Sequence, residues 1–206
     1  MNPEELEALM ERKSKMRRQA YDARNAQENK EAVSKIIIDT FVEQPEYKAA
    51  KTVMWYIDAR SEVRTRPQLE AAIACKDKKI AVPYCVDDVL QLWWLESMDE
   101  MVVGMWKILE PPKDRWNEAA KRVDPGELDL VMVPGVGFDR RGARMGNGKG
   151  YYDKLLEHTR ADCTLLAPAY ACQMFPEIIV GPHDMFMDKV ITEKAVYPGL
   201  GRKGPN

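Results

Sequence analysis

A glycine-rich loop lies between an apolar run and a helical pattern, and it is the part of this sequence most able to do chemistry. The run at 128–133 stops at Pro134-Gly135, and the loop that follows carries Gly137, Gly142, Gly146, Gly148 and Gly150. Tyr151-Tyr152-Asp153 then opens a segment with helical apolar spacing. Glycines let backbone N–H groups and a helix N-terminus close on an anion. Because Arg144 and Lys149 add positive charge to this loop, the segment predicts a polyphosphate site.

The spacing of this loop excludes two common phosphate-binding motifs. A Walker A loop needs Ser or Thr after its Gly-Lys pair, whereas Lys149 is followed by Gly150 and Tyr151. The dinucleotide fingerprint GxGxxG does not match glycines at 146, 148 and 150. The loop therefore belongs to another class.

The whole segment from Pro134 to Asp153 resembles the signature of the 5-formyltetrahydrofolate cyclo-ligase family, whose pattern is close to PGxxFDxxGxRxGxGxGYYD. The matching residues are Pro134, Gly135, Phe138, Asp139, Gly142, Arg144, Gly146, Gly148, Gly150, Tyr151, Tyr152 and Asp153. The resemblance implies ATP- and Mg²⁺-dependent closure of 5-formyltetrahydrofolate to 5,10-methenyltetrahydrofolate, with release of ADP and phosphate. It also implies a three-layer α/β/α fold with a Rossmann-like, mostly parallel sheet.

A basic stretch near the N-terminus carries a second candidate group. Lys13 and Arg17 are four residues apart, so they share one helical face and can converge on one anion. A solvated surface helix is the alternative, but the resemblance implies that this pair lies against ATP. Neighbouring Arg12, Lys15 and Arg18 leave the register of the pair open. The residues implied to bind ATP are Lys13, Arg17, Arg144, Gly146, Asn147, Gly148, Lys149, Gly150, Tyr151 and Tyr152.

Two aspartates are candidates for holding Mg²⁺, an ion that takes one or two carboxylates together with water and substrate phosphates. Asp153 stands at the start of a predicted helix, where a carboxylate is also favoured by the helix dipole alone. The resemblance implies that Asp153 and Asp188 are the ligands. Asp184 competes with Asp188 for the second position.

The resemblance also implies contacts with the reduced folate. Glu62 follows a short strand, and its carboxylate suits the paired N–H donors of a pterin ring. Trp106 would supply an aromatic wall, and Asn147 and Tyr152 would also touch the substrate. Asn147 stands where some relatives carry a basic residue, so the substrate contact there is expected to be weaker or to come from Arg144 or Lys149. Trp93-Trp94 has no family role, and core packing and pocket lining both remain open.

The implied reaction needs no protein nucleophile. The formyl oxygen takes the γ-phosphoryl group, the folate N10 attacks the same carbon, and phosphate leaves, so proximity within one molecule does much of the catalysis. We therefore expect the catalytic groups to be the positive charges of Lys13, Arg17, Arg144 and Lys149, which stabilise charge rather than form bonds. Only two histidines are present in the chain.

Strands that alternate with helices predict an α/β architecture in one domain covering 1–206. The expected helices are about 3–25, 28–42 and 66–75, and another begins at Tyr151. The expected strands are 52–57, 79–82 (ended by Pro83), 90–95, 128–133, 164–170 and 188–192. The tail at 197–206 is rich in Gly and Pro, and we expect it to be frayed.

Composition excludes several other classes of protein. A net charge of −2 over 206 residues gives no general attraction to nucleic acid or to an anionic membrane. The four cysteines show no metal or disulfide spacing, and no apolar run reaches the ~20 residues of a membrane span. No signal peptide is evident, so we expect a cytoplasmic monomer that binds only small molecules. Two alternatives remain: a diverged enzyme acting on another formyl or acyl compound, and a non-catalytic nucleotide- or RNA-binding protein.

Overall fold

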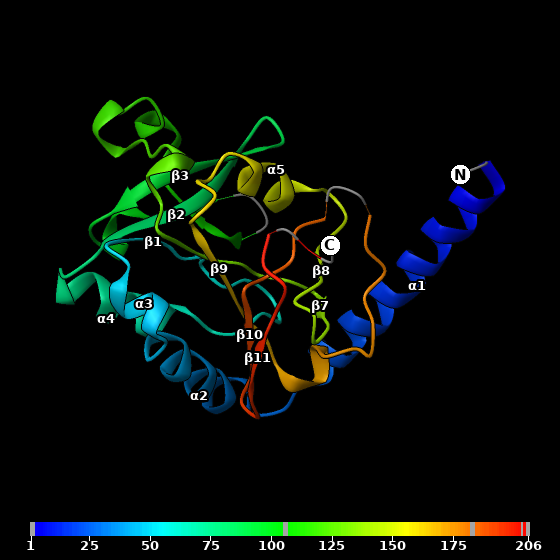
Figure 1. Cartoon of the computed structure of the whole chain (residues 1–206). Helices are drawn as coiled ribbons and strands as arrows, with labels where there is room; N and C mark the ends of the chain where they lie inside the picture. The colour runs from blue at the N-terminus through cyan, green and yellow to red at the C-terminus, as the bar shows by residue number, and fades with distance from the viewer. Residues whose placement is uncertain (1–2, 105–106, 182–183, 203, 205–206) are drawn as a thin grey trace.

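The computed structural model describes residues 3–104, 107–181, 184–202 and 204, and its centre is a seven-stranded sheet with the order β11-β10-β9-β6-β1-β2-β3 (Figure 1). Its strands are β1 (Thr52–Met54), β2 (Lys79–Val86), β3 (Val89–Leu95), β6 (Leu130–Met132), β9 (Thr164–Pro168), β10 (Lys189–Ile191) and β11 (Val196–Pro198). The α-helices are α1 (Pro3–Ala26), α2 (Lys30–Val42), α3 (Pro45–Ala49), α4 (Arg66–Cys75) and α5 (Tyr151–Glu157). Two short ribbons complete the strands, β4 (Val102–Val103) with β5 (Leu109–Glu110) and β7 (Gly137–Phe138) with β8 (Arg144–Met145).

The central strands of the sheet run parallel, and its two edge strands run antiparallel. β2, β1, β6, β9 and β10 pair in parallel, whereas β3 and β11 fold back on their neighbours. The mostly parallel α/β fold expected from the sequence is therefore confirmed.

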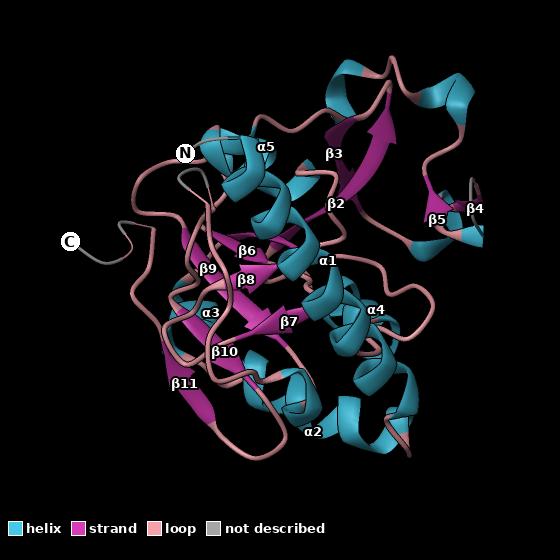
Figure 2. Cartoon of the chain, turned by 90° about the vertical axis from the view of Figure 1, so that its right-hand side faces the viewer, coloured by secondary structure: helices cyan, strands magenta, loops and turns pink. Residues whose placement is uncertain are grey.

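Helices cover both faces of this sheet. Val53 and Trp55 pack on one face with buried residues of α2, α3 and α4, while Met54, between them in sequence, packs on the other face with α5. This alternation follows from the two-residue period of a strand. Figure 2 shows the resulting layers. The residues of the central parallel strands are therefore buried on both faces of the sheet, as the apolar runs predicted.

Pro83 does not end β2, contrary to the sequence-based expectation. β2 pairs with β1 only as far as Ala81, and beyond that point it pairs only with β3, where Pro83 lies opposite Leu92. The side of β2 that faced β1 is therefore unpaired at Pro83, so a residue without an N–H is tolerated in the strand.

The C-terminal tail is also more ordered than expected. Residues 196–198 form β11, and the backbone N–H of Leu200 donates to the oxygen of Arg141 at 2.8 Å. The Arg202 guanidinium donates to the oxygens of Leu156 and Cys163 at 3.2 and 3.4 Å. The bond to Leu156 satisfies a carbonyl in the last turn of α5, and the other two tie the tail to the residue before β9 and to the loop before β8, which explains why a Gly- and Pro-rich segment is held here.

Asp129 ties together the starts of two central strands. Its Oδ2 accepts the N–H groups of Lys51 and Thr52 at 2.8 and 2.9 Å, and its Oδ1 accepts from Arg160 at 2.8 Å. Burial alone would raise the pKa of Asp129, but these hydrogen bonds outweigh it and hold that pKa well below its usual range.

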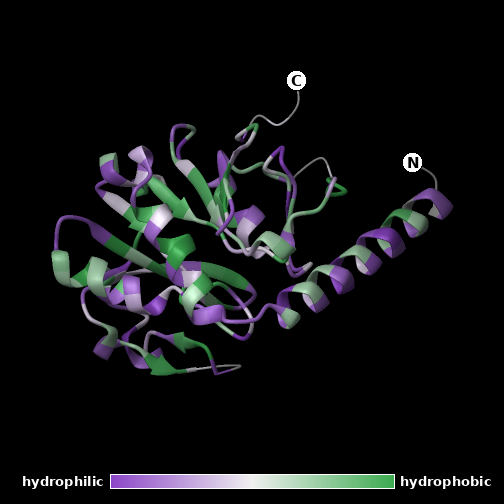
Figure 3. Cartoon of the chain, turned by 90° about the horizontal axis from the view of Figure 1, so that it is seen from below, coloured by the Kyte–Doolittle hydropathy of each residue, from purple (hydrophilic) through white to green (hydrophobic). Residues whose placement is uncertain are grey.

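Helix α1 leaves the body of the protein as a long polar rod, as Figure 3 shows. It spans 24 residues and confirms the predicted helix, and its buried positions lie in its second half at Ala20 and Arg24. That half contacts β7 and the short turn at 171–173. In the part of the chain that is described, no helix combines the length and apolarity needed to cross a membrane.

Candidate active site

A cleft of about 920 Å³ opens at the carboxyl ends of β1 and β6, where parallel α/β sheets commonly bind ligands. Its walls come from α1, the segment after β1, the β2–β3 hairpin, residues 108–116, the glycine-rich loop and the start of α5. The predicted site residues that line it are Lys13, Arg17, Glu62, Arg144, Gly146, Asn147, Gly148, Lys149, Gly150, Tyr151, Tyr152 and Asp153. Residues more than 130 positions apart in sequence thus meet in one place.

The glycine-rich loop closes tightly against α1. The Arg17 Nε donates to the oxygen of Gly146 at 3.1 Å. Gly148 has φ +91°, and a Cβ built there would lie 3.3 Å from the Arg17 Cζ. A side chain at this position would therefore be strained and would crowd the guanidinium. The glycine keeps the loop backbone and a cation side by side.

Arg144 is a buried cation at the base of this loop. Only 4% of its side chain is exposed, and its Nη2 donates to the Asp153 Oδ1 at 2.6 Å. Its Nη1 donates to the oxygen of Pro134 at 3.3 Å, and its Cζ lies 5.9 Å from the centre of the Tyr152 ring. Its Nε is buried and has no hydrogen-bond partner among the described residues. An unpaired buried donor on a charged group is well suited to an anionic ligand.

A stripe along α1 extends the predicted Lys13–Arg17 pair. Lys13, Arg17, Tyr21 and Arg24 follow one another at intervals of four, four and three residues, and all four line the cleft. Lys13 Nζ lies 3.1 Å from an oxygen of Asp184, and the Tyr21 hydroxyl donates to the side-chain oxygen of Asn147. Tyr21 and Arg24 were missed from the sequence, although their helical spacing was the available signal.

Glu62 lies in the cleft with one oxygen held and the other open. Its Oε2 accepts the N–H of Ala59 at 3.0 Å, and its Oε1 lies 3.9 Å from the Arg24 Nη1. Burial raises the pKa of Glu62. Burial also raises the pKa of Tyr152 and Tyr56, and the nearby Glu62 carboxylate adds to both effects.

Aromatic side chains form the wall on the β2–β3 side. The rings of Tyr84 and Trp116 are 5.4 Å apart, and both line the cleft. The expected aromatic wall residue, Trp106, lies outside the described residues. Trp93 is fully buried in the core, and neither it nor Trp94 lines the cleft, so core packing accounts for Trp93.

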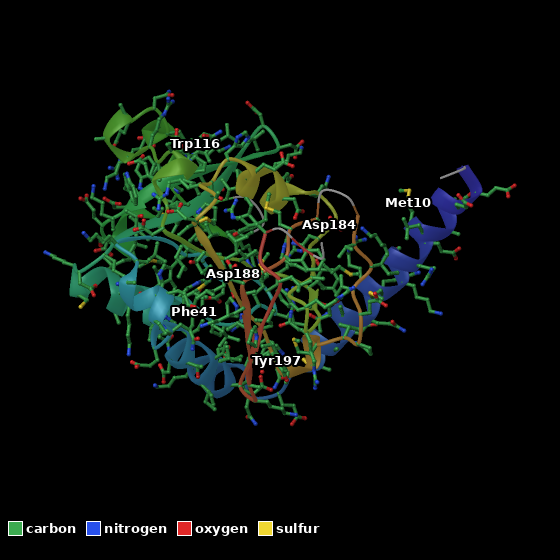
Figure 4. The ribbon with its side chains drawn as sticks, in the orientation of Figure 1. Met10, Phe41, Trp116, Asp184, Asp188 and Tyr197 are labelled. Carbon is green, nitrogen blue, oxygen red and sulfur yellow. The ribbon has the colours of Figure 1, made fainter. Side chains whose placement is uncertain are left out.

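The structure separates the two candidates for a second acidic ligand. Asp184 lines the same cleft as Asp153, whereas Asp188 lines a different cavity of about 330 Å³. The Asp188 Oδ2 accepts the N–H of Leu165 at 2.7 Å, which ties it to the start of β9. Figure 4 shows Asp184 toward α1 and Asp188 at the sheet. The structure therefore does not bring Asp188 together with Asp153, although the sequence predicted that pairing; Asp184 shares the cleft with Asp153 instead.

No cluster of three or more His, Cys, Asp or Glu side chains suited to a metal ion occurs among the described residues. An ion in this cleft would therefore take most of its ligands from water and from a bound phosphate chain, as Mg²⁺ commonly does.

Comparison with known proteins agrees with this geometry. The model of the 5-formyltetrahydrofolate cyclo-ligase family matches residues 8–193. The chain belongs to that family. It is 30% identical over 175 residues to a probable 5-formyltetrahydrofolate cyclo-ligase of Schizosaccharomyces pombe, covering 77% of this chain and 83% of the relative. It is 30% identical over 224 residues to the mitochondrial 5-formyltetrahydrofolate cyclo-ligase of Arabidopsis thaliana, covering 96% and 79%.

A solved structure shares the fold. The 5,10-methenyltetrahydrofolate synthetase of Aquifex aeolicus superposes with a TM-score of 0.78 at 31% identity, covering 94% of this chain and 95% of that one. The membership implied by the glycine-rich signature is therefore confirmed, and the family is ATP-dependent.

Proposed function

We propose that this cleft is where the chain carries out its 5-formyltetrahydrofolate cyclo-ligase activity, binding ATP and 5-formyltetrahydrofolate and closing the folate to 5,10-methenyltetrahydrofolate. One observation carries the assignment of the site: the α1 cations meet the glycine-rich loop in a cleft that also holds Glu62. The α1 cations and the glycine-rich loop suit a polyphosphate, and the Glu62 carboxylate suits a ring with N–H donors.

The phosphate chain of ATP fits the side of the cleft formed by α1 and the loop. Lys13, Arg17 and Lys149 bring positive charge there, and the unpaired Nε of Arg144 offers a buried donor. Loop glycines let the backbone approach the phosphates closely. We assign ATP binding to these residues together with the loop from Gly146 to Tyr152.

The reduced folate fits beside it, against Glu62 and Tyr152. The open Oε1 of Glu62 and the second lone pair of Oε2 are acceptors for two pterin N–H groups. Asn147, which accepts from Tyr21, leaves its amide N–H groups for the substrate. This placement would put the pterin next to the phosphate side of the cleft.

The chemistry conserves atoms and charge in two steps. The formyl oxygen attacks the γ-phosphorus of ATP, the bond to the β-γ bridging oxygen breaks, and ADP leaves. The folate N10 then attacks the formyl carbon, the carbon–oxygen bond breaks with loss of inorganic phosphate, and N10 releases its proton. No covalent bond to the protein forms at any point.

The protein's part is to hold the two substrates and to stabilise negative charge. Charge accumulates first on the transferring phosphoryl group and then on the departing phosphate. The cations of Lys13, Arg17, Arg144 and Lys149 lie in the cleft that would hold it, in a partly buried site where such interactions are stronger than in water.

We propose that Asp153 and Asp184 provide the acidic ligands for Mg²⁺. Both line the cleft on the phosphate side, and each already neighbours a cation that we assign to ATP. When bound, the ion would neutralise part of the negative charge of the phosphate chain.

The test is formation of the conjugated methenyl product, followed by near-ultraviolet absorbance with and without ATP and Mg²⁺. We expect product only with both. Lys149→Ala should lower the rate, while Lys154→Ala should not, because Lys154 is an exposed lysine of α5 that does not line the cleft. Nucleotide hydrolysis without the absorbing product would favour a relative with another formyl or acyl substrate.

A further inference from the structure

Arg24 is a buried cation to which the proposed reaction gives no direct role. Only 3% of it is exposed, on the face of α1 that lines the cleft. Its Nε donates to the Ser61 Oγ at 3.1 Å, and its Nη1 donates to the oxygen of Gly135 at 3.2 Å. A buried guanidinium is unfavourable unless a carboxylate compensates it. The carboxylate within reach is Glu62, at 3.9 Å.

Glu62 is also held by groups other than Arg24. The Ala59 N–H donates to its Oε2, and the Tyr170 hydroxyl donates to its backbone oxygen at 3.1 Å. The Tyr170 hydroxyl in turn shares a hydrogen bond with the Ser34 hydroxyl at 2.9 Å. These bonds fix the loop, so Arg24 can act on the Glu62 carboxylate through its charge, at 3.9 Å, without forming a hydrogen bond to it. The Oε1 remains free for a ligand.

Charges of both signs surround Glu62. The groups that face it from the neighbouring elements are Arg24 of α1, Asp58 and Arg60 of its own loop, Tyr56 after β1 and Tyr152 of α5. Burial raises the pKa of Glu62 and Asp58 acts in the same direction, whereas the Ala59 N–H, Arg24 and Arg60 lower it. Arg60 is exposed to solvent, which screens its charge. Arg24 is the buried counter-charge.

We infer that Arg24 is a positioning residue for the reduced folate, and that it keeps the Glu62 carboxylate ionised and turned into the cleft. This inference rests on the proposed function, in which Glu62 receives the pterin N–H groups. A protonated Glu62 would present a donor where the pterin also has donors, and binding would weaken. Removing Arg24 should therefore make folate binding sensitive to pH at values where the wild type is not.

The experiment measures KM for 5-formyltetrahydrofolate and for ATP between pH 5.5 and 8 in the full chain. In Arg24→Gln, we expect the folate KM to rise toward acidic pH and to be several-fold higher at pH 5.5 than at pH 8, because loss of the buried cation raises the pKa of Glu62 further, while the wild-type value stays within about twofold. The ATP KM should show no such difference between the two proteins. In Glu62→Gln, the folate KM should be high at every pH.

Arg64→Gln is the matched control. The Arg64 Nη1 donates to the oxygen of Arg60 at 2.8 Å and lies 3.4 Å from an oxygen of Asp58, so it anchors the same loop. It does not line the cleft. Its loss should affect stability but keep the wild-type pH profile of the folate KM.

A folate KM profile in Arg24→Gln parallel to that of the wild type would overturn the inference, since a purely structural arginine would give that result. If Arg24→Gln does not fold, Arg24→Lys decides. A wild-type profile supports the role of charge, and a KM raised equally at all pH values overturns it. Absence of methenyl product from the wild type would refute the proposed function and the inference together.

Discussion

Asp153 and Asp184, the two proposed Mg²⁺ ligands, should differ sharply in what their neutralisation costs the folded state. Asp153 pairs at 2.6 Å with Arg144, whose side chain is 4% exposed, and is itself 23% exposed. Asp184 pairs at 3.1 Å with Lys13, and these two side chains are 29% and 25% exposed. One member of the first pair, Arg144, is therefore largely removed from water, while both members of the second pair remain hydrated.

The structure sets the size of each effect. Removing one partner of a buried ion pair costs about 3–5 kcal/mol. Asn at 153 keeps an oxygen that can accept from Arg144, and water reaches the site, so we expect about 2 kcal/mol for Asp153→Asn. For a chain of this size, that lowers the melting temperature by about 4–8 °C. Asp184→Asn should cost about 1 kcal/mol or less.

Two measurements check this prediction. Thermal unfolding without ligands should rank Asp153→Asn well below Asp184→Asn in melting temperature. Titration of Mg²⁺ against initial rate should show a raised metal requirement for both variants and a wild-type requirement for Asp188→Asn, because Asp188 lines another cavity. The double variant of Asp153 and Arg144 should lose less stability than the sum of its two single variants.

Equal melting temperatures for Asp153→Asn and Asp184→Asn would refute the energetic reasoning. A raised metal requirement in Asp188→Asn, with a normal one in Asp184→Asn, would return the second ligand position to Asp188. The melting-temperature result and the metal-requirement result can fail independently of each other, so each tests a separate prediction.

Three further predictions concern the loop, α1 and the sheet. Gly148→Ala, at φ +91° and 3.3 Å from the Arg17 Cζ, should raise the ATP KM about tenfold, equivalent to about 1.4 kcal/mol, whereas Gly150→Ala, with nothing within 4 Å, should have a smaller effect. Lys13→Ala and Arg17→Ala should raise the ATP KM in steady-state assays while the melting temperature changes by about 2 °C or less. Asp129→Asn should remove stability that is present above pH ~4 and lost as pH falls, because hydrogen bonds lower the pKa of Asp129 in the fold; urea unfolding at pH 7 and pH 3 should show the difference from wild type shrinking in acid.

The elements of this fold were predictable where local patterns decide them. The helix at 66–75 has a proline in its first turn and is found at those bounds. The parallel sheet follows from apolar runs that alternate with helices. β2 was cut short at Pro83 because a proline inside a strand is normally excluded. Pro83 is tolerated because β1 has already ended beside it, and the end of β1 cannot be read from the residues around Pro83.

The site residues likewise divide into those placed by local sequence and those placed by tertiary packing. The residues from Gly146 to Asp153 match the family pattern in their own spacing and line the cleft, so the sequence sufficed to predict their place in the candidate site. Asp184 and Asp188 are four positions apart, yet they line different cavities. The path of the backbone between them therefore decides which cavity each carboxylate enters. Nothing in the local sequence specifies that path. Tyr84 and Trp116 are likewise brought together by packing of distant segments.

The stripe on α1 explains why this helix can be so polar and still be integral to the cleft. Arg24 lies eleven positions after Lys13, a rise of about 16 Å along the axis. Lys13 contacts Asp184 on the side that we propose for the phosphates, and Arg24 lies beside Glu62 on the side that we propose for the folate. One helix thus contacts both proposed halves of the cleft, so a shift of α1 would move Lys13 and Arg24 together. The distance between them is set by the backbone of one helix, so substitutions that loosen α1 should raise the KM of both substrates, whereas Arg24→Gln should affect the folate KM alone.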